Sequence, residues 1–368
     1  MNIVFTRSST IYDDSRATKE ITALLEAGHN VTVLGWNRNG LAEEKCKKLF
    51  AKYTNRIIFL FYSGDVGHTK ISKMIARKKW SQWLQGNLSL INGIDVIHAC
   101  DYDTGATVRI FSKNKGVRYV YDIYDYYVDA HPVPKLLKSY IEKGEIDTIE
   151  NAEFTIICTE ERREQIKKAV PKKLVVVHNS PEVIKLEEPP EEYDYVYCGS
   201  LYDGRLIKET LDEYPNHEQL HFVFAGYGEY TEIARKMAVE FSGFEFLDSI
   251  PYAQVLEVEM KSKVISALYD PRIRNHQLCA PNKFYEALAL GKPLIVCKGT
   301  GIDRVVEKEN IGYTINYDVH EFYDAINKLV HDPALRKEMG YKARKLYESK
   351  YRWELMKERL ISEYMCLK

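Results

Sequence analysis

The sequence predicts an α/β protein made of two domains, each with a parallel sheet covered by helices. Short β-branched segments alternate with helical patterns along most of the chain, which is typical of parallel sheets with crossover helices. The alternation is broken once, by an acidic and proline-rich stretch. The length of 368 residues also fits two domains, at about 100–200 residues for each domain.

The first half of the chain predicts a complete α/β domain over residues 1–180. The alternation predicts strands at 2–6, 31–35, 56–62, 94–98, 118–123, 153–158 and 173–178. It predicts helices at 16–27, 70–92, 103–114, 134–151 and 160–168. Gly28 stands where the C-terminal cap of the first helix is expected.

A linker and a second domain are expected to follow. Residues 181–194 contain three prolines and six acidic residues without periodicity, which is typical of a linker. The alternation then restarts, with strands at 195–198, 220–225, 244–247, 264–268, 293–297 and 312–315. Helices are expected at 205–213, 229–241, 252–260 and 282–290, and the pattern from about 319 to 365 is almost wholly helical.

Charge and hydropathy argue against several classes of protein. The chain has 52 Lys+Arg and 53 Asp+Glu, and this balance disfavours a nucleic-acid-binding protein. No apolar run reaches the roughly 18–20 residues that span a bilayer. The N-terminal residues MNIVFTRSST lack the apolar core of a signal peptide, so we expect a cytoplasmic protein.

The seven cysteines are expected to be buried, reduced thiols. Their number is odd, they are widely scattered and no CxxC pair occurs, which disfavours a disulfide framework or a zinc site. Most lie in or beside apolar stretches, where a reduced cysteine behaves as a small hydrophobe. They are Cys46, Cys100, Cys158, Cys198, Cys279, Cys297 and Cys366.

Residues 269–303 hold the densest group of candidate functional side chains. Asn282 is placed at the start of a helix that Gly291 would end. The unpaired N–H groups of such a helix start favour a phosphate or a sugar hydroxyl. Lys283 could meet a diphosphate, and Glu286 could accept two hydrogen bonds from a ribose diol. Alternatively, Glu286 only complements the helix dipole and Lys283 is solvated.

The stretch NKFYEALALGKPLIV, residues 282–296, resembles the strongest motif of the family 4 retaining glycosyltransferases, which have the GT-B fold. The resemblance implies that Glu286 holds the donor ribose and that Asn282 and Lys283 make polar contacts with the donor. The first glutamate of the family motif is replaced here by Leu278.

The resemblance extends over nearly the whole chain and implies two Rossmann-like domains whose parallel sheets face an interdomain cleft. Residues 1–180 would bind the acceptor, and residues 195–350 would bind the nucleotide sugar. The last segment, 351–368, is similar to a C-terminal helix that packs back on the N-terminal domain.

Two turns resemble the donor-binding loops of the family. Gly199 and Ser200 follow a strand where the family has Gly-Arg, so Ser200 replaces one of two cations for the donor diphosphate. Arg205 is the candidate for the remaining cation and for a catalytic role, or else is a surface cation at a helix start. Gly226 lies in a turn that would bring the backbone near the nucleotide base, or is a plain turn.

Five residues of the first domain are candidates for the acceptor side and for catalysis. Ser8 and Arg16 follow the first strand, and Asp101 follows a later one. Arg16 is expected to bind an acidic acceptor group or the donor phosphate, unless it is only a cation at a helix start. Tyr124-Asp125 stands where relatives often have His-Asp. Asp125 is expected to contact the acceptor hydroxyl or the sugar, and Tyr124 to donate one hydrogen bond to the sugar.

The resemblance implies a retaining hexosyltransferase that uses a UDP- or GDP-linked sugar and a glycan or polyprenyl-linked acceptor. The usual setting of such enzymes is bacterial surface polysaccharide biosynthesis. No Asp-x-Asp pair stands at a convincing strand end of the donor domain, so we expect no metal cofactor. A sugar-nucleotide epimerase on the same fold, or a non-catalytic paralogue acting as a partner subunit, are the alternatives.

Segment 45–79 is strongly basic, with ten Lys/Arg against the single acid Asp65. Apolar residues that include Ala76, Trp80 and Leu84 recur at helical spacing in the helix predicted at 70–92, which overlaps this segment. Such a segment favours peripheral contact with the inner face of the cytoplasmic membrane. The alternative is a helix with its tryptophans in the core and a solvated cationic face.

Overall fold

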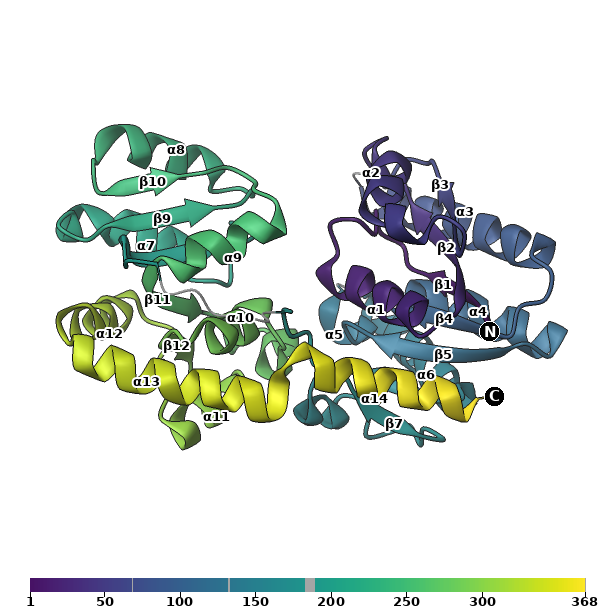
Figure 1. Ribbon diagram of the computed structural model, residues 1–368. Coiled ribbons are helices and arrows are strands. Elements are labelled where there is room, and N and C mark those ends of the chain that lie inside the picture. The colour runs from purple at the N-terminus through teal and green to yellow at the C-terminus, as the bar shows by residue number, and fades with distance from the viewer. Residues whose placement is uncertain (68, 132, 183–188, 368) are drawn as a thin grey trace. The chain divides into compact units, whose positions relative to one another are not determined.

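The computed structural model describes residues 1–67, 69–131, 133–182 and 189–367 (Figure 1). The contacts divide the chain into two compact units. Unit 1 comprises Met1–Val177 and Lys357–Lys368, and unit 2 comprises His178–Met356. The linker predicted at 181–194 lies partly outside the described residues, which omit 183–188.

Unit 1 is built on a seven-stranded sheet in the order β3-β2-β1-β4-β5-β6-β7, and every neighbouring pair is parallel. The strands are β1 (Asn2–Thr6), β2 (Asn30–Trp36), β3 (Ile57–Tyr62), β4 (Val96–Cys100), β5 (Arg118–Ile123), β6 (Thr155–Ile157) and β7 (Leu174–Val176). The strand order reverses between β1 and β4. The loops after these two strands therefore diverge, and a ligand site is expected beyond their carboxyl ends.

Helices lie on both faces of this sheet (Figure 1). They are α1 (Ser15–Glu26), α2 (Ala42–Leu49), α3 (Lys70–Leu90), α4 (Tyr102–Lys115), α5 (Tyr127–Ala130), α6 (Lys135–Asn151) and α14 (Trp353–Cys366). Local sequence sets where several of them begin. The Asp14 side chain accepts a hydrogen bond from the Ala17 amide at the start of α1, and Thr69 and Ser72 form a capping box at the start of α3.

The apolar face predicted around Trp80 belongs to the core of unit 1. Ala76, Trp80 and Leu84 of α3 are buried, and the Trp80 ring stacks on Trp36 of β2. This face is therefore not available to a membrane. In the described part of the chain, no helix combines the length and apolarity needed to cross a bilayer.

Unit 2 is built on a six-stranded parallel sheet in the order β10-β9-β8-β11-β12-β13. The strands are β8 (Tyr193–Cys198), β9 (Phe222–Ala225), β10 (Phe244–Phe246), β11 (Ser262–Ala267), β12 (Leu294–Cys297) and β13 (Gly312–Ile315). The helices are α7 (Ile207–Glu213), α8 (Thr231–Glu240), α9 (Tyr252–Met260), α10 (Asn282–Leu290), α11 (Ile302–Glu309), α12 (Val319–His331) and α13 (Pro333–Leu346). The strand order here reverses between β8 and β11, which marks a second expected ligand site.

The structure confirms the predicted α/β class with two parallel sheets and differs from the prediction in several short elements. Helices α2, α5 and α11 were not predicted. Each buries at most two residues, which leaves an apolar stripe too narrow to recognise. The helix expected at 160–168 is only a 3₁₀ segment, Glu160–Glu164.

The cysteines follow the prediction with one exception. None of them forms a disulfide, and six of the seven are buried. Cys366, near the end of α14, is exposed.

Candidate functional site

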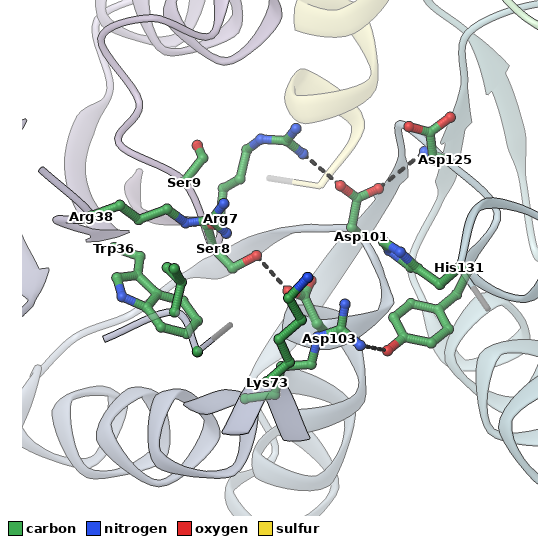
Figure 2. A pocket seen from close by; sticks show the side chains of 14 residues that line it. Arg7, Ser8, Ser9, Trp36, Arg38, Lys73, Asp101, Asp103, Asp125 and His131 are labelled. Atoms are coloured by element: carbon green, nitrogen blue, oxygen red, sulfur yellow. Dashed lines mark hydrogen bonds and ion pairs between the residues drawn. The ribbon is translucent and has the colours of Figure 1, made fainter. Parts of the chain in front are cut away.

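A pocket of about 540 Å³ lies in unit 1 beyond the carboxyl ends of β1, β2, β4 and β5 (Figure 2). This is the position that the strand order predicts for a ligand site. Its lining residues are Arg7, Ser8, Ser9, Trp36, Arg38, Val66, Gly67, Lys73, Arg77, Asp101, Asp103, Asp125, Tyr127 and His131. Three of the residues proposed from the sequence, Ser8, Asp101 and Asp125, are thus brought together in one cavity.

Asp101 lines this pocket and binds three neighbouring groups. Its Oδ2 lies 2.6 Å from Arg7 Nη1, and its Oδ1 accepts hydrogen bonds from the backbone amides of Tyr124 and Asp125 at 3.0 and 3.1 Å. Its φ of 60° with ψ of 163° is a conformation that side chains other than glycine rarely adopt. The contacts therefore hold a strained backbone in place. Burial raises the pKa of Asp101 to about 7, although Arg7 opposes the shift.

The other two carboxylates of the pocket also have partners. The Ser8 hydroxyl donates a hydrogen bond to Asp103, and Arg162 Nη2 lies 3.2 Å from Asp125 Oδ1. The Asp125 side chain nevertheless remains 52% exposed, so it can still accept a hydrogen bond from a ligand hydroxyl.

Arg16 and Tyr124 do not have the positions that the acceptor-side and catalytic roles required. Arg16 is buried beneath α1, with Nη2 2.9 Å from Asp122 Oδ1 and Nη1 2.6 Å from the Val177 carbonyl. The Tyr124 hydroxyl points into the same buried region and donates to Glu20 Oε2 at 3.3 Å. Neither residue lines the pocket. Arg16 is a core cation, and Tyr124 packs its ring 3.7 Å beneath the Arg7 guanidinium.

One buried group near Arg16 has the composition of a metal site. His98, Cys100 and Asp122 each place a ligand atom within 4.8 Å of the others. Asp122 is already bound by Arg16, and His98 Nδ1 lies 2.6 Å from the Tyr364 hydroxyl. We therefore assign these residues to the core of unit 1.

Four lining residues that carry a positive charge or a hydroxyl group were not singled out from the sequence as site residues. Arg38 follows β2, Lys73 and Arg77 lie on α3, and Tyr127 begins α5; all four line the pocket. The signal was present for the two α3 residues, because they belong to the basic segment 45–79, but neither the membrane-facing interpretation nor the solvated alternative placed them in a site.

In unit 2, the glycines predicted at the strand ends allow two loops to touch. A Cβ on Gly226, after β9, would lie 1.8 Å from the Gly199 carbonyl oxygen, after β8. A Cβ on Gly228 would lie 2.2 Å from the Leu201 carbonyl oxygen. Only glycine fits at such an approach. The two loops therefore form one tightly packed backbone surface at the strand ends.

Lys283 and Arg205 each lie over a tyrosine ring at this end of the sheet, and both act electrostatically on Tyr269. Lys283 Nζ lies 4.7 Å from the centre of the Tyr197 ring and 2.5 Å from the point where a Cβ of Gly199 would stand. The Arg205 guanidinium lies 5.5 Å from the centre of the Tyr269 ring. Burial lowers the pKa of Lys283, but Tyr197, Tyr269 and acidic neighbours outweigh it and raise that pKa.

Neither cation forms an ion pair in the part of the chain that the structure describes, although the buried acids Glu286 and Glu259 act electrostatically on Lys283. Among these residues, Lys283 and Arg205 form no ion pair with a carboxylate, whereas Lys208 lies 2.5 Å from Asp212. Both residues are half-buried, so their positive charges are less screened by water than those of a fully exposed cation. Two cations at a strand-order reversal are therefore suited to an anionic ligand.

Glu286 lies one turn after Lys283 and is buried, with the Tyr252 hydroxyl as a hydrogen-bonding neighbour. A second buried acid, Glu259 of α9, was not singled out from the sequence. Burial and the charge of Glu286 raise the pKa of Glu259 well above its usual value, although Lys283 opposes this. The signal for Glu259 was absent because an acid inside a helical pattern normally faces solvent.

The remaining predicted donor residues have structural contacts within unit 2. Asn282, at the start of α10, accepts a hydrogen bond from Asn179 Nδ2 at 2.5 Å. The Ser200 carbonyl accepts one from the Tyr197 hydroxyl at 2.9 Å. Leu278 ends the 3₁₀ segment Arg274–Leu278 just before α10, and Gly291 ends α10 in the left-handed conformation, as predicted.

Comparisons with known proteins agree with this architecture. Residues 180–346 match the family described as glycosyl transferases group 1. No curated protein matches the chain in sequence.

Several solved structures share the fold over the full length. A sucrose-phosphate synthase from Thermosynechococcus elongatus has a TM-score of 0.72 and 15% identity, with 100% of this chain and 99% of that chain covered. Anabaena HepE in complex with UDP-glucose has a TM-score of 0.70 and 13% identity, with both chains covered to 100%.

A variant of S. aureus TarM, in complex with Fondaparinux, alpha-GlcNAc-glycerol and UDP, has a TM-score of 0.69 and 13% identity. The alignment covers 100% of this chain and 99% of that one. Together with the two parallel sheets and their reversed strand orders, these matches identify the fold of the chain as GT-B, and residues 180–346 are similar to the glycosyl transferases group 1 family.

Proposed function

We propose that this protein transfers a sugar from a nucleotide-diphospho-sugar, UDP- or GDP-linked, to a glycan or lipid-linked glycan. The observation that carries the proposal is the pair formed by Arg205 and Lys283, which have no ion-pair partner among the described residues. A nucleoside diphosphate is the anionic leaving group of such a reaction, and fixed cations stabilise the charge that develops on it. HepE in complex with UDP-glucose and TarM in complex with UDP support this choice of donor.

The donor would be held by the strand-end surface of unit 2. Glu286, in the middle of α10, is the proposed ribose ligand. Asn282, at the start of the same helix, is a further proposed polar contact. The packed loops at Gly199, Ser200 and Gly226 would present backbone groups to the nucleotide. Backbone groups at strand ends are well suited to this because they need no further ordering when the ligand binds.

The acceptor would be held by the pocket of unit 1. Asp125 and Asp101 are the proposed partners of the acceptor hydroxyl, with Ser8 as a secondary contact. Arg16 and Tyr124 are left out of this set because their polar atoms are committed to the core.

The proposed reaction retains the anomeric configuration by attack from the same face as the departing diphosphate. The leaving phosphate would accept the proton of the acceptor hydroxyl, so the protein would supply charge stabilisation and orientation more than a strong base. Arg205 and Lys283 supply the positive charge that a metal ion would otherwise bring to the diphosphate, and metal independence is therefore part of the proposal. The proposed setting is bacterial surface polysaccharide biosynthesis.

We propose that the exposed side of α3 contacts the membrane. This side differs from the apolar face around Trp80 that the sequence suggested. Ile71, Met74 and Ile75 are 72%, 63% and 51% exposed on the first turns of α3. The exposed cations Lys78 and Lys79 follow on the same helix. Apolar side chains beside lysines favour the surface of an anionic bilayer, where each lysine contributes about 1 kcal/mol. Cosedimentation should therefore be seen with phosphatidylglycerol vesicles and not with phosphatidylcholine vesicles, and equal recovery with both would contradict the contact.

The first test of the donor is thermal stability in the presence of UDP, GDP, dTDP or CDP, each with and without EDTA. A nucleotide at 100 times its dissociation constant should add about 2.7 kcal/mol of stability. Arg205→Gln and Lys283→Gln should each reduce this gain. Lys337→Gln, which removes an exposed cation of α13 that makes no ion pair among the described residues, should leave it unchanged.

Further outcomes separate the alternatives. Retained transfer by Glu286→Ala would overturn the ribose assignment. Conversion of the donor sugar without any acceptor would favour an epimerase, and the absence of any nucleotide effect would favour a non-catalytic partner subunit. The anomeric proton of the first-formed product, followed by NMR, would decide between retention and inversion.

A further inference from the structure

The pocket of unit 1 contains three cations that lack ion-pair partners within the described ranges. They are Arg38, which follows β2, and Lys73 and Arg77, which lie on successive turns of α3. Arg38 donates a hydrogen bond to the Ser8 carbonyl, and Arg77 donates one to the Tyr127 hydroxyl. Both of these partners are neutral, so the positive charges are not compensated.

The carboxylates of the same pocket do not neutralise these cations. Asp101 is paired with Arg7 and Asp125 with Arg162. Asp103, the third carboxylate, accepts the Ser8 hydroxyl and makes no ion pair among the described residues (Figure 2). Asp103 raises the pKa of Arg38, but burial lowers it by more, so the guanidinium still lacks full compensation.

The spacing of the two α3 cations makes the arrangement unfavourable in the absence of an anion. Lys73 and Arg77 are four residues apart on one helix face, where like charges repel. Arg38 adds a third positive charge from a different element of the same cavity. An anion bound between the three would remove this repulsion.

The chemistry of the three groups favours phosphate. Two guanidinium groups and one ammonium approach from different elements, which suits an anion with several acceptor oxygens and up to two negative charges. A single carboxylate would be satisfied by one arginine fork. We propose that Arg38, Lys73 and Arg77 bind a phosphate or diphosphate group carried by the acceptor, which rests on the proposed function only in that it assigns this pocket to the acceptor.

The proposal deepens the role of the pocket by dividing it into two sides. Asp101, Asp103 and Asp125 accept hydrogen bonds and so suit sugar hydroxyls. Arg38, Lys73 and Arg77 suit the anionic group. The acceptor phosphate could belong to a phosphorylated sugar or to a lipid diphosphate, and both sources present the same chemistry to these cations.

The test measures binding to the full chain by calorimetry, with the donor site first saturated by the nucleotide that gave the largest thermal shift. The probes are glucose, glucose 6-phosphate, glucuronate and geranyl diphosphate at constant ionic strength. We expect glucose 6-phosphate, geranyl diphosphate or both to bind at least tenfold more tightly than glucose and glucuronate. The probe that binds more tightly identifies the source of the phosphate.

The matched variants remove equal charge inside and outside the pocket. R38Q/K73Q/R77Q should lose the preference for phosphate and keep its nucleotide-induced thermal shift. K113Q/K115Q/K138Q removes three exposed cations that do not line the pocket and should keep the preference. If the first triple variant does not fold, Lys73→Gln alone is the substitute. This variant should fold, because Lys73 is exposed and makes no ion pair within the described ranges, and it should bind phosphate more weakly.

Three outcomes would overturn the inference. The first is that neither glucose 6-phosphate nor geranyl diphosphate binds more tightly than glucose, the second is that neither binds more tightly than glucuronate, and the third is an equal loss in the two triple variants. These outcomes are independent of the nucleotide test. A chain that binds no nucleotide fails the proposed function, and the phosphate preference can then be measured without nucleotide.

Discussion

Arg7 and Asp101 join the ends of β1 and β4, the two strands between which the sheet order of unit 1 reverses, with Arg7 Nη1 2.6 Å from Asp101 Oδ2. The ion pair bridges the point where the two following loops diverge. Because Asp101 also binds the amides of Tyr124 and Asp125, one carboxylate fixes the ends of three strands. The geometry of the pocket therefore depends on it.

Asp101→Asn should weaken acceptor use without preventing folding. Asparagine has nearly the same shape as aspartate and so adds no backbone strain, but it removes the charge that holds Arg7. We expect kcat/KM for the acceptor to fall about tenfold to hundredfold, which corresponds to about 1.5–3 kcal/mol for a hydrogen bond to a charged group. Nucleotide binding should be unchanged. Asp147→Asn, on the exposed side of α6, is the control, and an equal effect of both variants would refute a specific role.

Gly226→Ala should destabilise unit 2 and weaken nucleotide binding. Its Cβ would overlap the Gly199 carbonyl, so the two strand-end loops would have to separate. Gly28→Ala is the matched control because Gly28 also has a positive φ, whereas a Cβ added there would meet no atom within 4 Å. The control should cost about 1–2 kcal/mol from backbone strain alone, and Gly226→Ala about 1–3 kcal/mol more from overpacking. Thermal unfolding with and without nucleotide measures both effects, and equal Tm values would contradict the close approach.

Tyr364→Phe should destabilise unit 1. The Tyr364 hydroxyl on α14 bonds to His98 Nδ1 at 2.6 Å, and both side chains are fully buried. Loss of the hydroxyl leaves a buried ring nitrogen without this partner, which costs about 1–3 kcal/mol. Tyr341→Phe, at a 69% exposed position, should have almost no effect in the same urea titration. A loss of similar size in both variants would show that the His98 contact is not the cause.

Glu145 should make stability depend on pH. Burial raises the pKa of Glu145 to about 8, although Tyr121 and the Tyr127 amide oppose this. The unfolded chain releases this proton near pH ~4.3. The native state then binds the extra proton between these values, so the free energy of unfolding should fall as the pH rises from about 4.5 to 8 and then level off.

Glu145→Gln removes this contribution because glutamine imitates the protonated acid. The stability of the variant relative to the unsubstituted chain should therefore increase with pH up to about 8, by at most about 1.4 kcal/mol per pH unit. Urea titrations at pH 5, 6, 7, 8 and 9 measure the difference. Parallel curves for the two proteins would show that Glu145 is ionised throughout.

The candidate site was predictable from the sequence where a residue directly follows a strand. Ser8, Asp101 and Asp125 meet in the pocket because parallel strands end at the same edge of the sheet. The same rule brought Gly199 and Gly226 into contact in unit 2. The rule does not extend to Arg16, the second residue of α1, because a helix residue can face either the loop or the sheet. The structure buries it against Asp122.

The sequence by itself determined the α/β class and the parallel sheets, because hydrophobic periodicity and turn residues are local properties. Only the tertiary structure decided which of the many cations are paired. Arg16 and Lys208 have carboxylate partners, whereas Arg205, Lys283 and Lys73 form no ion pair within the described residues. Pairing depends on distances between segments far apart in the chain, and composition, which gives a nearly neutral total, contains no information about those distances.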